Sequence, residues 1–146
     1  MSVFLLDVNV LVALSWPGHQ FHDRTQHWFG RHCSNGWATC PITQAGFVRI
    51  LSNPAFSPRA VAPAEAIRVL EITVSHPRHQ FWKDDLPLTD AVLAFRSKLV
   101  GHQQITDAYL LGLVMHKKGK LATLDHSISK LLPLGTRAES LVESIE

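Results

Sequence analysis

The chain has 146 residues, with 14 Lys and Arg against 12 Asp and Glu, so its formal net charge is +2. This length predicts a single domain over residues 1–146, and the composition excludes a disordered or fibrous chain. So small a charge does not by itself argue for nucleic-acid binding. No segment reaches the roughly 18 apolar residues of a membrane span. The apolar start lacks a basic leader, which fits a strand better than a signal peptide.

The run Val3–Leu6 predicts a buried strand of a parallel sheet that ends at Asp7. In open α/β sheets, ligands bind beyond the carboxyl ends of the strands. A carboxylate among apolar residues is costly to bury unless it meets a cation. Asp7 is equally suited to cap a helix over residues 8–14, so both interpretations stay open on these residues alone.

Helices and strands alternate along the rest of the chain. We predict helices over residues 19–33, 43–52, 63–76, 88–99, 107–118 and 128–132, and strands over 37–40, 80–82, 120–124 and 138–142. Thr106 is the predicted cap of helix 107–118, and Gly119 its stop. The alternation predicts a three-layer α/β/α domain with a mainly parallel central sheet.

The two cysteines, Cys33 and Cys40, are too few for a disulfide framework, which favours a reducing cytoplasm. His27 and His32 lie nearby, but their spacing to the cysteines matches no common zinc module. We therefore expect two buried free thiols.

Three acids are predicted to meet at one edge of the sheet. Asp7 and Asp125 each follow a strand, and Asp107 begins the helix that leads into the strand before Asp125. Parallel strands joined by right-handed crossovers end at the same edge, where the crossover helix also starts. Each acid has a simpler explanation: Asp107 gains about 0.3–1 kcal/mol at a helix N-terminus, and Asp125 suits a turn. Their coincidence favours a site.

Carboxylates brought together raise one another's pKa values. A hard divalent cation relieves this repulsion, and Mg²⁺ or Mn²⁺ needs only a few protein carboxylates. Such an ion activates water and stabilises the charge on a phosphoryl group. Asp7, Asp107 and Asp125 are therefore the predicted metal ligands and catalytic residues.

Four ordered blocks resemble the signature blocks of PIN-domain ribonucleases, most closely the VapC toxins of bacterial toxin–antitoxin pairs. The blocks are Leu5–Leu11, Trp37–Leu51, Ile105–Leu111 and Leu121–Asp125. The resemblance implies a PIN-like fold and a Mg²⁺- or Mn²⁺-dependent endoribonuclease that cuts structured RNA, such as tRNA or rRNA. It also implies a cognate VapB-like antitoxin and a homodimer.

Carried over position by position, Asp7, Asp107 and Asp125 match three acids of the family, with one metal held mainly by the first two. Asn9 and Thr123 match its flanking polar positions, which orient ligands or waters as a second shell.

Gln44 stands where many PIN domains have Glu, and it is expected in the second shell. A neutral amide can bond water but cannot act as a base, so the general base stays open. Asp90 is a possible source of the missing charge, although a helix-terminus role is simpler. A catalytically weak RNA- or partner-binding module is therefore an alternative function, and a metal-dependent DNA nuclease is another.

RNA binding requires cations around the acidic centre. The predicted phosphate contacts are Arg49, Arg59 and Lys83, although a solvated surface explains each of them as well. The further candidates are Arg78, Arg96 and Lys98, with Phe81 or Trp82 able to stack on an unpaired base. The apolar stretches of residues 47–56 and 67–74 fit either core or a homodimer interface.

Overall fold

The computed structural model describes residues 2–146. Its centre is a sheet of five strands, all parallel, in the order β3-β2-β1-β4-β5. The strands are β1 Phe4–Leu6, β2 Trp37–Thr39, β3 His79–Phe81, β4 Lys120–Thr123 and β5 Val142–Ser144. The predicted α/β/α class with a parallel sheet is confirmed.

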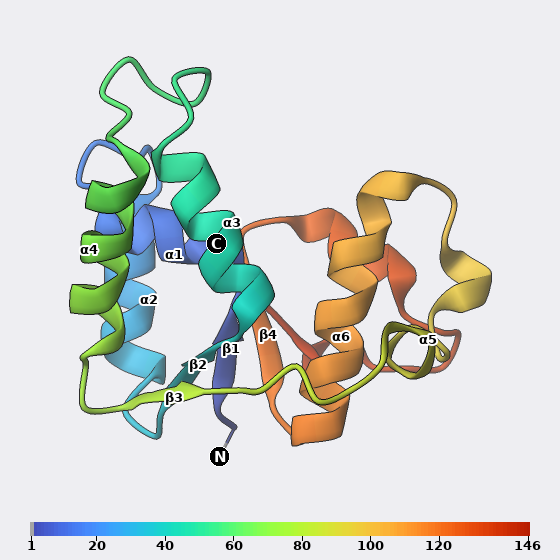
Figure 1. Cartoon of the computed structure of the whole chain (residues 1–146). Coiled ribbons are helices and arrows are strands. Elements are labelled where there is room, and N and C mark those ends of the chain that lie inside the picture. The colour runs from blue at the N-terminus through green and yellow to red at the C-terminus, as the bar shows by residue number, and fades with distance from the viewer. Residues whose placement is uncertain (1) are drawn as a thin grey trace.

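Helices cover both faces of this sheet (Figure 1). They are α1 Val8–Ser15, α2 His22–His32, α3 Pro41–Leu51, α4 Pro63–Val74, α5 Leu88–Ala91 and α6 Ile105–Lys117, with 3₁₀ turns η1 Arg96–Lys98, η2 His102–Gln104, η3 His126–Leu131 and η4 Ala138–Ser140. Helices α1 to α4 lie on one side, and α5 and α6 on the other (Figure 1).

The side chains of the central strands alternate between two apolar cores. Leu5 and Leu121 pack against α6, whereas Phe4, Leu6 and Ala122 pack against the helices of the opposite side. This alternation follows from the two-residue period of a strand. Because both faces are covered, the strands are apolar throughout, as the sequence indicated.

The predicted helix over 88–99 is wrong beyond Ala91. After α5 the backbone tightens into bonds between residues three apart, from Leu93 N–H to the Asp90 carbonyl and from Phe95 N–H to the Val92 carbonyl. These turns carry Phe95 into the core, where it is fully buried. Tertiary burial of one aromatic ring therefore overrides the local helical pattern.

Several element boundaries also differ from the prediction. Helix α3 begins at Pro41, two residues early, because proline suits the first helical position. Helix α6 begins at Ile105, with Gln104 as N-cap, so Thr106 lies inside the first turn and is not the cap. The predicted helices 19–33 and 128–132 are α2 and the turn η3, and the last strand is β5 rather than 138–142.

Burial decides three further expectations. Cys33 and Cys40 are buried and free, as predicted. Trp82 is only 7% exposed, so its predicted stacking on a base is wrong, whereas Phe81 is 51% exposed. Within the described residues, no helix is both long and apolar enough to cross a membrane.

The two apolar helical stretches that fit either core or interface also divide. In the first, Phe47 and Leu51 are core residues. In the second, Ile67 and Ile72 on α4 are exposed, so only part of that stretch is core.

Candidate functional site

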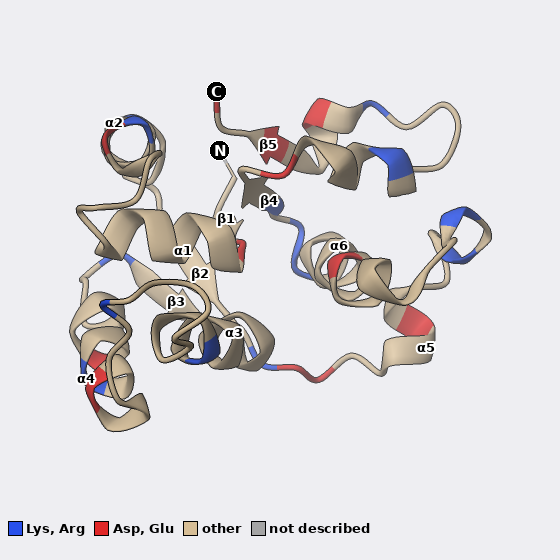
Figure 2. Ribbon diagram, turned by 90° about the horizontal axis from the view of Figure 1, so that it is seen from above, with Lys and Arg blue, Asp and Glu red and all other residues tan. Residues whose placement is uncertain are grey.

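Acidic side chains gather at the carboxyl edge of the sheet. Strands β1 and β4 are neighbours, with Leu6 opposite Ala122, so Asp7 and Asp125 leave the sheet side by side. Viewed onto this edge, acidic positions lie at the start of α1, near the start of α6 and just after β4 (Figure 2). The topology thus brings together three segments that are far apart in the sequence.

Asp7 is both a helix cap and a member of this acidic edge. Its Oδ1 accepts the N–H of Val8 at 2.8 Å, and its Oδ2 accepts the hydroxyl of Thr123 at 2.8 Å. The side chain is buried. Burial raises the pKa of Asp7, the bonds from Thr123 and Val8 oppose this shift, and the charge of Asp125 adds to it. The two interpretations left open for Asp7 are therefore compatible.

Thr123 links the ends of β1 and β4. While its hydroxyl donates to Asp7, its Oγ1 accepts the N–H of Asp125 at 3.0 Å and the Nδ2 of Asn9 at 3.4 Å. Asn9 Oδ1 in turn accepts the N–H of Leu124 at 3.2 Å. One proton donated and two bonds accepted use the full capacity of a hydroxyl group. Thr123 and Asn9 thus fix the loops that carry two of the acids.

Asp107 lies in the first turn of α6 and is half-buried. Its pKa is raised to about 6, first by burial and then by the charges of Asp7 and Asp125. A nearby like charge disfavours the ionised form of a carboxyl group. The three acids therefore form one electrostatic group.

Asp125 is exposed and caps the turn η3. Its Oδ1 accepts the N–H of Ser127 at 2.9 Å and the hydroxyl of Ser127 at 2.7 Å. These bonds hold the carboxylate at the rim of the site, beside the more buried Asp7.

Among the residues that the structure describes, no basic side chain neutralises this group. Within residues 2–146, none of the three acids forms an ion pair with Lys, Arg or His. Nor do three or more Asp, Glu, His or Cys side chains in that part of the chain converge closely enough to hold a metal by themselves. The donors are those that Mg²⁺ and Mn²⁺ prefer, and these ions retain waters where protein ligands are few. The residues fit a divalent cation that takes part of its coordination from water or substrate.

Gln44 is hydrogen-bonded to the carboxyl end of β2. Its Nε2 donates to Thr39 Oγ1 at 3.0 Å, and that oxygen lies 2.7 Å from His79 Nε2. Local sequence patterns gave no signal for Thr39 or His79, because these residues lie on neighbouring strands 40 positions apart. Asp90 is exposed in the first turn of α5.

The predicted phosphate contacts are exposed and come from three different segments. Arg49 lies in the last turn of α3, Arg59 in the loop before α4, and Lys83 between β3 and α5. Positive positions are spread around the molecule in the same view (Figure 2). The three residues lie on different segments of the chain.

Residues 4–131 match the family model of the PIN domain, and the chain belongs to the PIN-domain family. It is similar to Ribonuclease VapC39 of Mycobacterium tuberculosis, with 44% identity over 125 residues, which cover 86% of this chain and 90% of that protein. Its identity to Ribonuclease VapC38 of the same organism is 43% over 127 residues, covering 87% and 88%. Within the PIN domains, this chain is a member of the VapC ribonuclease family.

Solved structures share the fold. The crystal structure of VapBC2 from Rickettsia felis, bound to a DNA fragment from its promoter, has a TM-score of 0.65 at 14% identity and covers 99% of each chain. The crystal structure of FitAcB from Neisseria gonorrhoeae has a TM-score of 0.62 at 17% identity and covers 96% of each chain. At these identities the likeness concerns the fold alone.

Proposed function

We propose that the chain is a metal-dependent endoribonuclease, the toxin of a VapBC-type pair, that cuts structured RNA such as tRNA or rRNA in the cytoplasm. The observation that carries this proposal is the placement of Asp7, Asp107 and Asp125 at one edge of the sheet, where their charges repel one another, with no basic partner among residues 2–146. Membership of the VapC ribonuclease family supports the same activity.

Asp7 and Asp107 would hold one Mg²⁺ or Mn²⁺, with Asp125 close by. When bound, the ion supplies positive charge for the phosphate and makes nearby water more acidic. Thr123 fixes Asp7 Oδ2, and Asn9 anchors the loop of Asp125 through Leu124. Such partners orient ligands, and their loss costs about 10–100-fold in metal affinity or activity.

Gln44 has a less direct role in this proposal. Its amide nitrogen is taken up by Thr39, so Gln44 fixes α3 against β2. We assign no proton transfer to it, since an amide side chain is neutral and cannot act as a base.

Arg49, Arg59 and Lys83 are the proposed phosphate contacts. Because they are exposed and lie on different segments, each would add one electrostatic contact to an extended RNA. Neutralised phosphates make binding weaker as salt increases. RNA affinity should therefore fall as the salt concentration rises, and each of these arginine or lysine residues should make that fall steeper.

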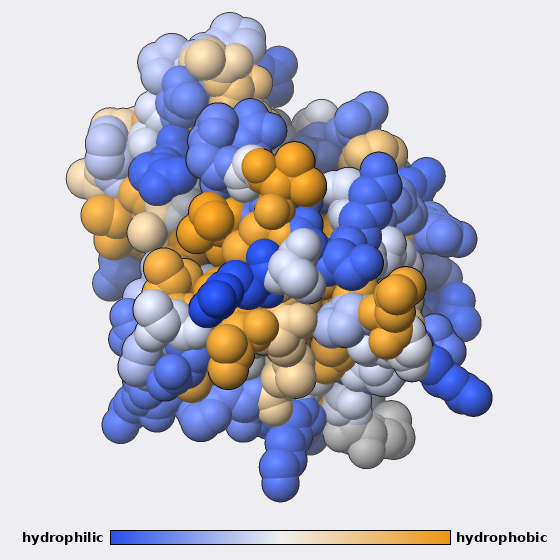
Figure 3. Space-filling model, turned by 90° about the vertical axis from the view of Figure 1, so that its right-hand side faces the viewer, coloured by the Kyte–Doolittle hydropathy of each residue, from blue (hydrophilic) through white to orange (hydrophobic). Residues whose placement is uncertain are grey.

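Two protein partners belong to the proposal. Structural neighbours of this fold include complexes named VapBC2 and FitAB, which supports a VapB-like antitoxin as partner. A homodimer is supported by the side formed by α5 and α6, where apolar side chains gather in patches (Figure 3). Leu93 is 65% and Met115 46% exposed there, and exposed apolar patches mark interaction sites.

The experiment is cleavage of total bacterial RNA by the purified chain with Mg²⁺, Mn²⁺ or EDTA. Discrete fragments should require metal, and Asp7→Asn or Asp107→Asn should slow cleavage by about 100-fold or more while circular dichroism shows an intact fold. Asp90→Asn, an exposed acid of another helix start, is the matched control and should cleave normally.

The other outcomes identify the alternatives. Full activity of both folded site variants would refute the assignment of the acids. RNA binding that is equal in EDTA, without cleavage, would identify a catalytically weak binding module. Cleavage of DNA alone in a parallel assay would identify a DNA nuclease.

A further inference from the structure

A cavity of about 350 Å³ lies directly beside the acidic edge. Thr106, which precedes Asp107, forms part of its wall. Ile42, from the first turn of α3, lines it as well. Both helices begin at the carboxyl side of the sheet, so the cavity and the acids share this edge. Its volume is near the lower end of the range of small-ligand sites, about 300–1,000 Å³.

Apolar side chains make up most of the wall. Besides Ile42 these are Leu86, Leu88 and Ile105. Leu88 is 49% and Ile105 39% exposed, so two apolar side-chain surfaces are open to a ligand. Such surfaces suit the face of a planar ring.

The wall carries three polar side chains, those of Asp84, Thr106 and Tyr109. Asp84 contributes a carboxylate, which accepts only. Tyr109 donates its own proton to the Leu86 carbonyl at 3.1 Å, which leaves its oxygen as an acceptor. Thr106 is the remaining polar side chain, whose hydroxyl can donate or accept, and no Lys, Arg, His, Asn or Gln lines the cavity. A ligand with adjacent donors is therefore favoured.

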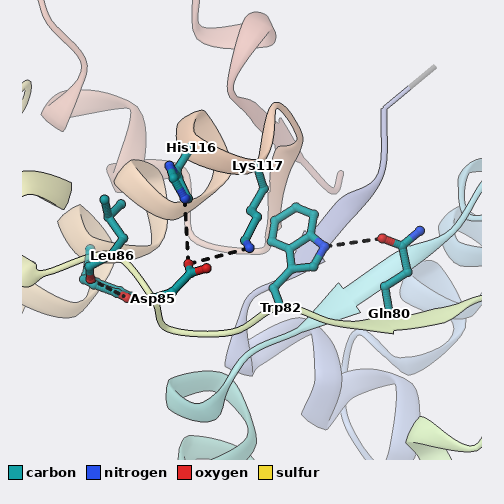
Figure 4. A network of polar contacts seen from close by, with 7 residues as sticks. Gln80, Trp82, Asp85, Leu86, His116 and Lys117 are labelled. Atoms are coloured by element: carbon teal, nitrogen blue, oxygen red, sulfur yellow. Dashed lines mark hydrogen bonds and ion pairs between the residues drawn. The ribbon is translucent and has the colours of Figure 1, made fainter.

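The segment that carries Asp84 is held in place (Figure 4). The Oδ1 atom of the neighbouring Asp85 lies 3.7 Å from both His116 Nε2 and Lys117 Nζ on α6. The bond from Tyr109 ties the backbone at Leu86 to the same helix. Asp84 is therefore carried by a segment fixed to α6, the helix that also bears Asp107.

We propose that this cavity binds an unpaired guanine base of the RNA substrate, with the Asp84 carboxylate accepting both donors of its Watson–Crick edge and Leu88 and Ile105 against the ring. This inference rests on the proposed ribonuclease function. Specific recognition of RNA mostly reads unpaired bases by stacking and by their Watson–Crick edges.

Donor geometry selects guanine among the four bases. Guanine presents N1–H and the N2 amine side by side, which matches the two oxygens of one carboxylate. Adenine and cytosine present one amine beside a ring nitrogen that accepts, and uracil one N–H between two carbonyls. Each of these would place an acceptor against the Asp84 carboxylate. Lys83 is exposed next to Asp84 and would contact a flanking phosphate.

The test is binding of dye-labelled single-stranded RNA by the full chain in EDTA, which separates recognition from cleavage. The probes are uridine octamers with guanosine, adenosine, cytidine or uridine at one central position. Wild type should bind the guanosine octamer at least about fivefold more tightly than the others, the lower value for a good bidentate base contact.

Two variants decide the role of Asp84. Asp84→Asn should abolish the preference for guanosine, even if removal of a negative charge strengthens binding of all four RNAs. Asp90→Asn, a carboxylate in the wall of a separate cavity, should retain the preference. Equal binding of the four RNAs by wild type, or an unchanged preference in Asp84→Asn, would overturn the proposal.

The cleavage assay with Mg²⁺ distinguishes failure of the guanine site from failure of the proposed ribonuclease activity. Fragments cut at a fixed distance from guanosine by wild type, with this rule lost in Asp84→Asn, support the base site. If wild type cuts RNA without regard to guanosine, the base site is refuted and the ribonuclease stands. If no RNA is cut, the ribonuclease is refuted, and binding in EDTA still decides the guanine site. If the chain binds an apolar peptide in this cavity but binds none of the RNAs, the cavity docks a protein and the proposal is overturned.

Discussion

Replacing Asp107 by Asn should stabilise the metal-free protein while it removes activity. The pKa of the Asp107 carboxyl group rises from its ordinary value of 3.8 to about 6 in the folded chain, because burial and the charges of Asp7 and Asp125 oppose its ionisation. Between these pH values the folded chain binds more protons than the unfolded chain. Stability therefore falls as pH rises through this window, and the full penalty is present above pH 6.

The size of the effect follows from the same shift. At 1.36 kcal/mol for each pKa unit, the upper value is about 3 kcal/mol. Because Asp107 is only half-buried, screening by solvent lowers this to roughly 1–2 kcal/mol. The asparagine amide has nearly the same shape and no charge. Asp107→Asn should thus gain about this much free energy of unfolding at pH 7, and only a few tenths of a kcal/mol at pH 4.

Urea denaturation in EDTA at pH 4 and pH 7 measures both values. Asp90→Asn is the control: it removes an exposed first-turn acid and should cost a few tenths of a kcal/mol at pH 7. Saturating Mg²⁺ should stabilise the wild type more than the Asp107→Asn variant, since binding to the folded state adds stability. The absence of a gain at pH 7, or an equal gain at pH 4, would show that Asp107 is not destabilised by its neighbours.

Three further changes test the fold and the site. Thr123→Val should cost about 1–3 kcal/mol in urea denaturation and slow cleavage about tenfold or more; because Thr123→Ser keeps the hydroxyl, it should restore most of both, and equal loss in the two would contradict the argument. Gly112→Ala should unfold the protein or cost more than about 3 kcal/mol, since its Cβ would lie 2.0 Å from the backbone of α5; Gly30→Ala, with open space around the new atom, should stabilise by about 0.5–1 kcal/mol in the same assay. Gln44→Leu should lower stability by about 1–2 kcal/mol through loss of its bond to Thr39, yet the folded variant should cleave RNA far faster than Asp7→Asn; equal inactivity would show that Gln44 acts within the acidic site.

Local patterns sufficed for the strands at the centre of the molecule. The runs ending at Asp7 and Asp125 are short, apolar and followed by an acid. Short apolar runs of this kind are typical of the strands of a covered parallel sheet. Because parallel strands end at one edge, the sequence also predicted which acids would be neighbours. The electrostatic coupling of Asp107 with both of them agrees with that order of elements.

The sequence failed where distant residues override local preference. The stretch after Ala91 has a helical pattern, but the core takes up Phe95 and the chain tightens into turns. Trp82 resembled a surface ring for stacking, yet it is buried, and a Cβ on Gly119 would lie 2.6 Å from its ring. Neither outcome can be predicted from the residues that are adjacent in the sequence.

The sequence by itself therefore determined the parallel sheet, the family of the chain and the three acids at the edge of the sheet. Only the tertiary structure decided that Thr123 would satisfy Asp7, that Gln44 would turn to Thr39, and that Asp84 would line a cavity beside Asp107. The physical reason is range. Periodicity and strand ends are properties of a few consecutive residues, whereas hydrogen-bond partners and cavity walls come from segments that meet only when the core is packed.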